Sequence, residues 1–134
     1  MTTEIYANIC KILTQQEVNN KIETIGTKKR IELLLKAVKK AFAVDVKLLT
    51  SNSRAYRLVF IRYAFTKIAK EQIGVHNNII AEALNRDRTL TNRNLEQAEM
   101  LLRYHDTFIF MYNRLKSEYN KIILNYLDKN LCNK

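Results

Sequence analysis

Residues 86 to 93 contain the side chains in this sequence that are best suited to bind a polyanion. They read Arg-Asp-Arg-Thr-Leu-Thr-Asn-Arg. An arginine guanidinium is a planar fork that pairs with phosphate oxygens or with the edge of a guanine base, so Arg88 is a candidate for either contact. Asp87 could accept a hydrogen bond from a cytosine amino group, or its carboxylate could simply cap a helix that begins after it.

The basic residues are unevenly distributed along the chain. Lys and Arg number 23 against 13 Asp and Glu, which gives a formal net charge of +10. Residues 1–50 contain eight Lys and one Arg, whereas residues 51–104 contain two Lys and seven Arg. A positive field attracts DNA, RNA or an anionic membrane surface, and the arginine-rich middle segment is the expected contact surface. The alternative is a solvated basic surface without a binding role.

The sequence contains no pattern that predicts catalysis or metal binding. His76 and His105 lie far apart without Cys, Asp or Glu at ligand spacing. Two isolated glycines do not make a phosphate-cradling loop. Cys10 and Cys132 lie near opposite ends without a Cys-x-x-Cys pair, which favours free thiols. We therefore expect a protein that is not an enzyme and needs no cofactor or metal.

The sequence also lacks the patterns of export and membrane insertion. The first ten residues contain no basic segment followed by an apolar run, which argues against a signal peptide. No stretch of uncharged apolar residues is long enough to span a bilayer. We therefore expect a cytoplasmic protein without a membrane partner, in a bacterium or a phage-infected host cell.

The spacing of apolar residues predicts an all-α protein. The chain has no Pro and only two Gly, whereas sheets need turns built on these residues. Helical periodicity predicts helices over about residues 3–19, 28–42, 54–72, 78–84, 88–104 and 106–129. Gly74 is expected to end the third of them in a left-handed conformation. We expect one helical domain, with N-terminal helices over 1–37, a core over 38–104 and a long additional C-terminal helix over 105–134.

The core contains the helix order of a helix-turn-helix. A short helix over 78–84 is followed by a tight turn at Asn85 and Arg86, and then by a longer helix for which Asp87 is well placed as the cap. Many helical bundles contain such a turn, so the spacing alone leaves a plain bundle open.

Three segments of the core match one family of DNA-binding domains. Residues 45–50 (Asp-Val-Lys-Leu-Leu-Thr) look like a loop ending in Leu-Leu-Ser, and residues 54–64 look like an arginine-rich stretch leading into a long helix. Residues 80–89 (Ile-Ala-Glu-Ala-Leu-Asn-Arg-Asp-Arg-Thr) look like the signature Ile-Gly-x-x-Phe-Gly-Gly-Arg-Asp-His-Thr-Thr. In this order and spacing, the segment from about Val38 to Leu102 resembles domain IV of the bacterial replication initiator DnaA. The resemblance covers about half of the chain.

The sequence departs from that family pattern in three ways. Arg88 stands where the family has His, and Leu90 stands where it has a second Thr. Asn85 replaces two Gly, which shortens the turn by one residue, and the Pro that commonly opens the first helix of the motif is missing. A changed reading helix implies a changed DNA site.

The resemblance implies a DnaA-like or Trp-repressor-like helix-turn-helix that binds double-stranded DNA, with the helix after Asp87 in the major groove. The chain has no ATPase part. From the resemblance we expect it to act in replication or transcription control, for example of a phage or another mobile element. The helix start at Asn77 and Asn78 would hold a phosphate, although Asn77 could instead be a plain cap. The expected DNA contacts, to bases or phosphates, are Arg54, Arg57, Arg62, Lys67, Asn77, Asn78, Arg86, Asp87, Arg88, Thr89, Asn92 and Arg93.

The C-terminal helix has the most regular apolar pattern in the chain. Steps of four and three residues connect Phe108, Tyr112, Leu115, Tyr119, Ile122 and Tyr126, which form a heptad-like seam. This Phe108–Tyr126 seam could pack inside the chain against the first helix, or it could join a homodimer or a protein partner. The alternative function is accordingly a helical structural or interaction protein, such as a phage protein, that retains the scaffold for protein contacts.

Overall fold

The structure is a computed structural model that describes residues 15–132. This part of the chain is all-α, as predicted, and contains no strand. Its elements are α2 (Gln15–Thr24), α3 (Thr27–Phe42), α4 (Val46–Leu49), α5 (Tyr56–Ile68), a π-helical segment η1 (Ala69–Ile73), α6 (Asn77–Leu84), α7 (Thr89–Tyr104) and α8 (Asp106–Cys132). The predicted first helix over 3–19 is described only from Gln15 onwards. Cys10 and the side chain of Cys132 lie outside the described part.

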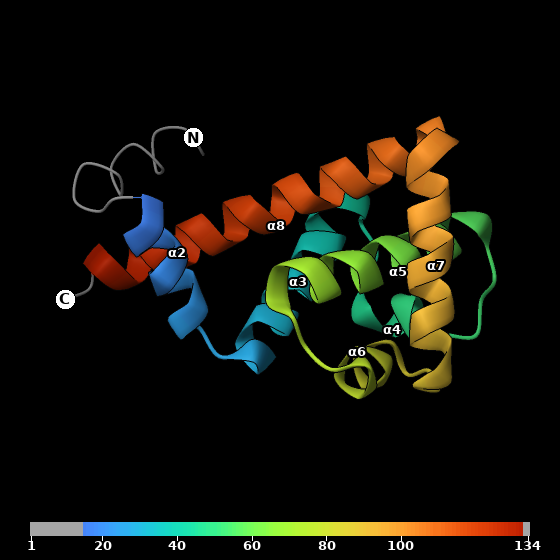
Figure 1. Ribbon diagram of the computed structural model, residues 1–134, viewed down its shortest axis with the longest axis horizontal. Coiled ribbons are helices and arrows are strands. Elements are labelled where there is room, and N and C mark those ends of the chain that lie inside the picture. The colour runs from blue at the N-terminus through green and yellow to red at the C-terminus, as the bar shows by residue number, and fades with distance from the viewer. Residues whose placement is uncertain (1–14, 133–134) are drawn as a thin grey trace.

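Helix α8 forms the long edge of the molecule and crosses α3 and α5 (Figure 1). Helix α5 lies at the centre, because it packs against α7 on one side and α8 on another. The fully buried side chains of Leu34, Ile61, Phe65, Phe108 and Leu115 come from α3, α5 and α8, so the core lies between these three helices. Helices α6 and α7 stand at the end of the molecule away from α2 (Figure 1).

The seam of the C-terminal helix is buried within the chain. Tyr112, Leu115 and Tyr119 face the core, where α8 packs against α3 and α5. Further along, the inward positions change to Ile123 and Leu127, while Ile122 and Tyr126 are only half-buried. A straight α-helix has 3.6 residues per turn, so a seam with a 3.5-residue repeat drifts around it. Of the two predicted alternatives, packing within the chain therefore applies to this face of α8. The face is not free to pair with another chain.

Several predicted helix boundaries differ from the structure. Helix α2 continues to Thr24, where a connection was predicted from residue 20. Helix α5 begins at Tyr56, because Ser51 and Ser53 stabilise the preceding loop instead of starting the helix. The Ser51 hydroxyl accepts from the Ser53 amide at 3.3 Å, and the Ser53 hydroxyl accepts from the Ala55 amide at 3.3 Å. Such local hydrogen bonds compete with a helix start.

A short helix, α4, lies in the segment that was predicted as a plain connection. Asp45 caps it, because its Oδ1 accepts from the Leu48 amide at 2.9 Å. Leu49 is fully buried and anchors the segment to the core. Within the single predicted domain, the expected start of the core at residue 38 falls inside α3, whereas the expected start of the C-terminal helix at residue 105 falls at the break between α7 and α8.

Candidate nucleic-acid interface

The turn between α6 and α7 has the geometry that the sequence predicts. Asn85 adopts a left-handed conformation with φ 55° and ends α6. Asn and Gly tolerate this conformation best, so Asn85 can end α6 in this way. The Arg86 amide then donates to the Ala81 carbonyl at 2.8 Å, which turns the chain toward α7. Helices α6 and α7 therefore form a helix-turn-helix unit.

Side chains hold the first turns of α6 and α7 together. The Asn77 Nδ2 donates to the Asn92 Oδ1 at 2.8 Å, and the buried Thr91 hydroxyl donates to the Asn77 carbonyl at 3.3 Å. The Asn77 side chain is therefore a bridge between the helices rather than the cap of α6. The N-terminal ends of both helices consequently lie side by side.

Asp87 caps the start of α7. Its Oδ1 accepts from the Thr89 amide at 3.0 Å and from the Thr89 hydroxyl at 3.1 Å. These two hydrogen bonds, together with the positive charge of Arg88, lower the pKa of Asp87 below its usual value of 3.8. Of the two roles that the sequence leaves open for Asp87, the geometry therefore favours the cap.

Replacing Asp87 by asparagine is expected to lower the melting temperature at pH 7, because an amide oxygen is a weaker acceptor at a helix start than a carboxylate. Because folding depresses the pKa of Asp87, its stabilising effect is complete above the unfolded value of 3.8 and disappears as the pH falls through the folded value. Thermal melts of both proteins at neutral and strongly acidic pH test this. A difference in melting temperature that is the same at both pH values would contradict the assignment.

The surface beside the α7 start carries basic and amide groups. Asn78, Arg88 and Asn92 are exposed there. They line a shallow groove together with Lys70, His76, Asn77 and Thr89, and none of these seven residues is acidic. The Lys70 Nζ donates to the Asn77 Oδ1 at 2.9 Å, which places a cation beside the N-terminus of α6. Free amides, the helix dipole and this cation together favour an anion at this end of the unit.

Arg62 has a structural role that the charge pattern does not reveal. Its side chain is only 6% exposed. The Nε donates to the Leu49 carbonyl at 2.8 Å, and the two terminal nitrogens donate to the carbonyls of Ser53 at 2.6 Å and Ser51 at 3.0 Å. Burial, and secondarily the positive charge of Arg86, lower the pKa of Arg62. Arg62 therefore holds the loop before α5, and its contact with a phosphate stays a prediction.

Arg86 holds the same loop from the other side. Its terminal nitrogens donate to the carbonyls of Ser51 and of Thr50, the latter at 3.3 Å. Arg62, from α5, and Arg86, from the turn between α6 and α7, thus converge on the Ser51 carbonyl. Both side chains hold the loop in place, and Arg86 is consequently a weak candidate for a base contact.

Lys67 and Arg57, two further predicted DNA contacts, interact with other groups of the fold. Lys67 pairs with Glu99 at 3.0 Å and with Glu71 at 3.8 Å, which connects α5 with α7. Arg57 donates to the Phe42 carbonyl at the end of α3. Phe42 is 15 residues from Arg57, and Glu99 is 32 residues from Lys67, so a local sequence pattern could not indicate these two partners.

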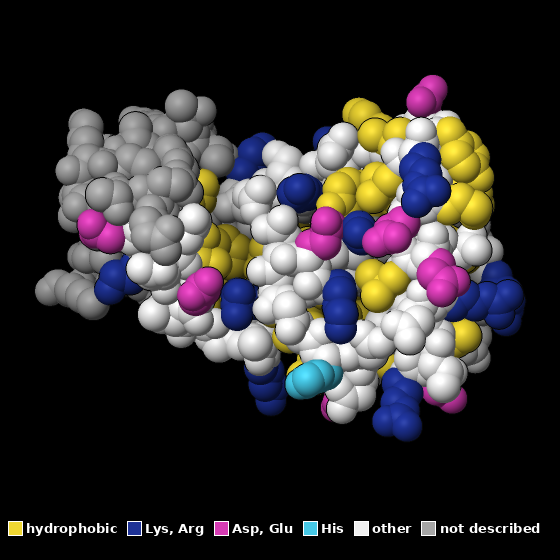
Figure 2. Space-filling view, viewed as in Figure 1, with side chains coloured by type: hydrophobic (Ala, Val, Ile, Leu, Met, Phe, Trp, Pro, Cys, Tyr) yellow, Lys and Arg dark blue, Asp and Glu magenta, His cyan; other side chains and the backbone are white. Residues whose placement is uncertain are grey.

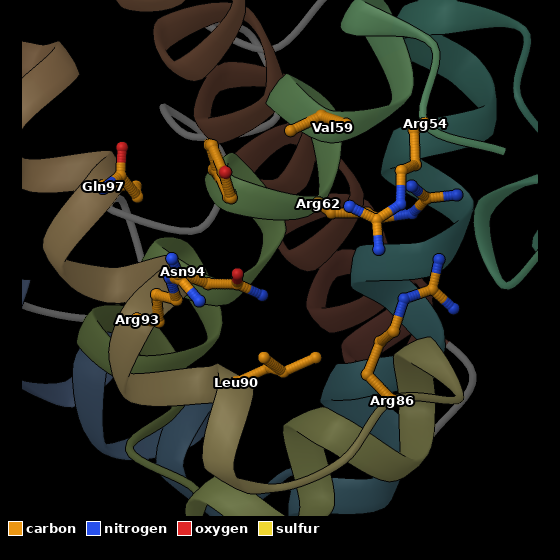
Figure 3. A pocket seen from close by; sticks show the side chains of 9 residues that line it. Arg54, Val59, Arg62, Arg86, Leu90, Arg93, Asn94 and Gln97 are labelled. Carbon is orange, nitrogen blue, oxygen red and sulfur yellow. The ribbon is translucent and has the colours of Figure 1, made fainter. Parts of the chain in front are cut away.

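The opposite flank of α7 carries a second concentration of arginine. Arg54 and Arg93 are exposed, and together with Arg62 and Arg86 they line a cavity between the loop before α5 and helix α7 (Figure 3). The prediction did not include Asn94 and Gln97, which also line it. Leu90, Asn94 and Gln97 follow one another at steps of four and three residues, and this spacing could have shown that they share one helix face.

The described residues offer no metal-binding cluster and no membrane-spanning helix. Within residues 15–132, no group of three or more His, Cys, Asp and Glu side chains is placed to hold a metal ion. No helix in the same range is long and apolar enough to cross a membrane.

The chain matches no protein-family model, no curated protein and no solved structure. The class that the fold defines is thus an all-α protein with a helix-turn-helix unit, and the resemblance to DnaA domain IV stays a prediction.

Proposed function

We propose that this protein binds double-stranded DNA through the helix-turn-helix unit of α6 and α7. The observation that carries the proposal is the exposed first turn of α7, where Arg88 and Asn92 stand beside the N-terminus of α6 without an acidic side chain in the groove between them. The net charge of +10 supplies the long-range attraction that a DNA-binding protein needs.

In this mode of binding, the first turn of α7 enters the major groove. Arg88 pairs with the two acceptors of a guanine, and Asn92 is in position to contact an adenine or the flanking backbone. The N-terminus of α6 and Lys70 hold a phosphate of the adjacent strand. Asp87 does not read a base in this scheme, because its carboxylate caps α7.

The structure reduces the number of cations that are available for DNA. With Arg57, Arg62, Lys67 and Arg86 engaged in the fold, Arg54, Lys70, Arg88 and Arg93 form the set that flanks the α7 start. About four phosphate contacts give a slope of about −3.6 for the logarithm of the association constant against the logarithm of salt concentration. Duplex affinity should then fall about a hundredfold between roughly 50 mM and 200 mM salt.

A mobility-shift or fluorescence-anisotropy titration with duplex DNA of random sequence measures this slope. Replacing Lys70 by alanine should make the slope less steep by about one unit, because one phosphate contact is lost. Replacing Lys40 by alanine, on the exposed surface of α3, is the matched control and should leave the slope unchanged. Absence of binding at low salt would refute the proposed function.

A helical interaction protein is the second candidate, and one surface favours it. Tyr56, Tyr104 and Phe110 are 56%, 64% and 66% exposed, at the start of α5, the end of α7 and the start of α8. Figure 2 shows hydrophobic side chains gathered at the corner where α7 meets α8. Exposed aromatic groups often mark a protein contact. The salt titration separates the two candidates, because a protein of the second class gives no duplex complex at low salt.

A further inference from the structure

The cavity beside α7 has the dimensions of a small-molecule site. It lies between the loop before α5, helix α5 and helix α7, and its volume is about 640 Å³. Sites for small ligands usually measure about 300–1,000 Å³. The space is therefore large enough for a mononucleotide.

One end of the cavity concentrates positive charge. The guanidinium groups of Arg54, Arg62 and Arg86 lie next to one another on the loop side (Figure 3). The partners of Arg62 and Arg86 are neutral backbone carbonyls, and no Asp or Glu lines the cavity. Arginine has five N–H donors, so Arg62 retains two after its three hydrogen bonds to the loop. Rigidly held, uncompensated guanidinium groups are suited to a phosphate.

The opposite wall differs in its chemistry. Asn94 and Gln97 project from α7 on that side (Figure 3), and their amides can both donate and accept. Tyr63 and Leu90 add an aromatic ring and an apolar side chain to the lining. Amide groups beside an aromatic ring can bind the edge and the face of a planar heterocycle. The cavity therefore has three guanidinium groups on the loop side, whereas the α7 side carries one arginine, Arg93, next to the groups that suit a nucleobase.

We propose that this cavity binds a nucleotide, with its phosphates at Arg54, Arg62 and Arg86 and its base at Tyr63, Asn94 and Gln97. This site goes beyond duplex DNA binding, because it takes a small molecule. The nucleotide and the DNA would use some of the same arginines. A nucleotide here would contact Arg54 and Arg93, which are also expected to face DNA phosphates, so it should weaken duplex binding.

Calorimetric titration of the full chain with ATP, GTP and inorganic pyrophosphate tests the proposal. We expect a nucleoside triphosphate to bind with a dissociation constant on the order of 10 µM at low salt, and more tightly than pyrophosphate. Combined replacement Arg54→Ala and Gln97→Ala should weaken that binding at least about tenfold. The matched control is Arg103→Ala with Gln72→Ala, which removes the same groups from exposed positions outside the cavity and should bind as the wild type does.

Three outcomes would overturn the nucleotide site. The first is no binding of either triphosphate at low salt. The second is equal weakening by the control pair, which would indicate attraction by the general charge of the protein. The third is that pyrophosphate binds as tightly as the triphosphates and that Gln97→Ala does not change triphosphate affinity. This result would leave only a phosphate site. If triphosphates do not bind but Arg54→Ala reduces duplex affinity, the cavity serves a DNA phosphate. Loss of duplex binding through Arg88 is measured separately, so the two proposals fail independently.

Discussion

Replacing Arg88 and Asn92 together by alanine is expected to reduce affinity for a preferred DNA duplex about a hundredfold. Both side chains are exposed at the start of α7, Arg88 directly before the helix and Asn92 in its first turn, where a major-groove contact would be made. A good bidentate pair contributes about 1–3 kcal/mol of discrimination against the wrong base, and the double variant removes two candidates for such contacts. The measurement is a titration with a duplex that the protein itself has enriched from a random pool.

The control for this variant is the pair Arg103→Ala and Asn113→Ala. It removes the same two residue types from exposed positions in the last turn of α7 and in α8, so the net charge changes equally. This control should change affinity for the enriched duplex less than about twofold, as expected for residues outside the contact. If both pairs reduce duplex affinity by the same factor, binding depends on overall charge and α7 does not read DNA.

The melting temperature of the Arg88 and Asn92 variant should be determined beside its affinity. Asn92 accepts the hydrogen bond from Asn77 that connects α6 with α7, so its replacement can loosen the unit. The single variant Arg88→Ala separates the two effects, because the exposed Arg88 side chain lies in solvent. It should lose duplex affinity while it keeps the wild-type melting temperature.

Replacing Arg62 by leucine is expected to lower the free energy of unfolding by about 3 kcal/mol. The change leaves the carbonyls of Leu49 and Ser53 without their donor in a partly buried loop, and it leaves the Ser51 carbonyl with Arg86 as its remaining donor. Each unsatisfied buried polar group costs about 1–3 kcal/mol, and water reaching the loop offsets part of the sum. Urea unfolding followed by circular dichroism gives the free energy directly.

Arg57→Leu is the matched control for the Arg62 variant. Arg57 is largely exposed and donates a hydrogen bond to the Phe42 carbonyl. Its replacement should cost less than about 1 kcal/mol. Arg62→Lys should fall between the wild type and Arg62→Leu, because an ammonium group cannot make the three forked contacts of a guanidinium. Equal costs for Arg57→Leu and Arg62→Leu would show that the loop does not depend on Arg62.

The sequence predicts the helices well because their signals are local. Gly74 adopts a left-handed conformation at φ 74° after η1, and Asn85 does so after α6, both where a helix was expected to end. The apolar periodicity of α8 likewise predicts a long helix with one buried face. Ala43 is different, because it adopts φ 58° at the end of α3 although alanine gives no sequence signal for this conformation.

The roles of individual arginines could not be predicted in the same way. Arg54, Arg57, Arg62 and Arg86 look alike in a charge pattern, yet the structure engages three of them in hydrogen bonds to backbone carbonyls. The partners of Arg62 are 9 to 13 residues away, and those of Arg86 in the loop are 35 and 36 residues away. Such contacts depend on how the loop before α5 folds back, which local propensity does not determine. The sequence therefore predicts the region of positive charge, while the fold selects which cations are available.

The most direct test of DNA binding by α6 and α7 is a nuclear magnetic resonance titration of the full chain with a short duplex of random sequence. We expect the largest shifts of backbone amide resonances at residues 77–78 and 88–93, at the two helix starts that lie side by side. Shifts confined to the aromatic corner around Tyr56, Tyr104 and Phe110, or no shifts at low salt, would contradict it.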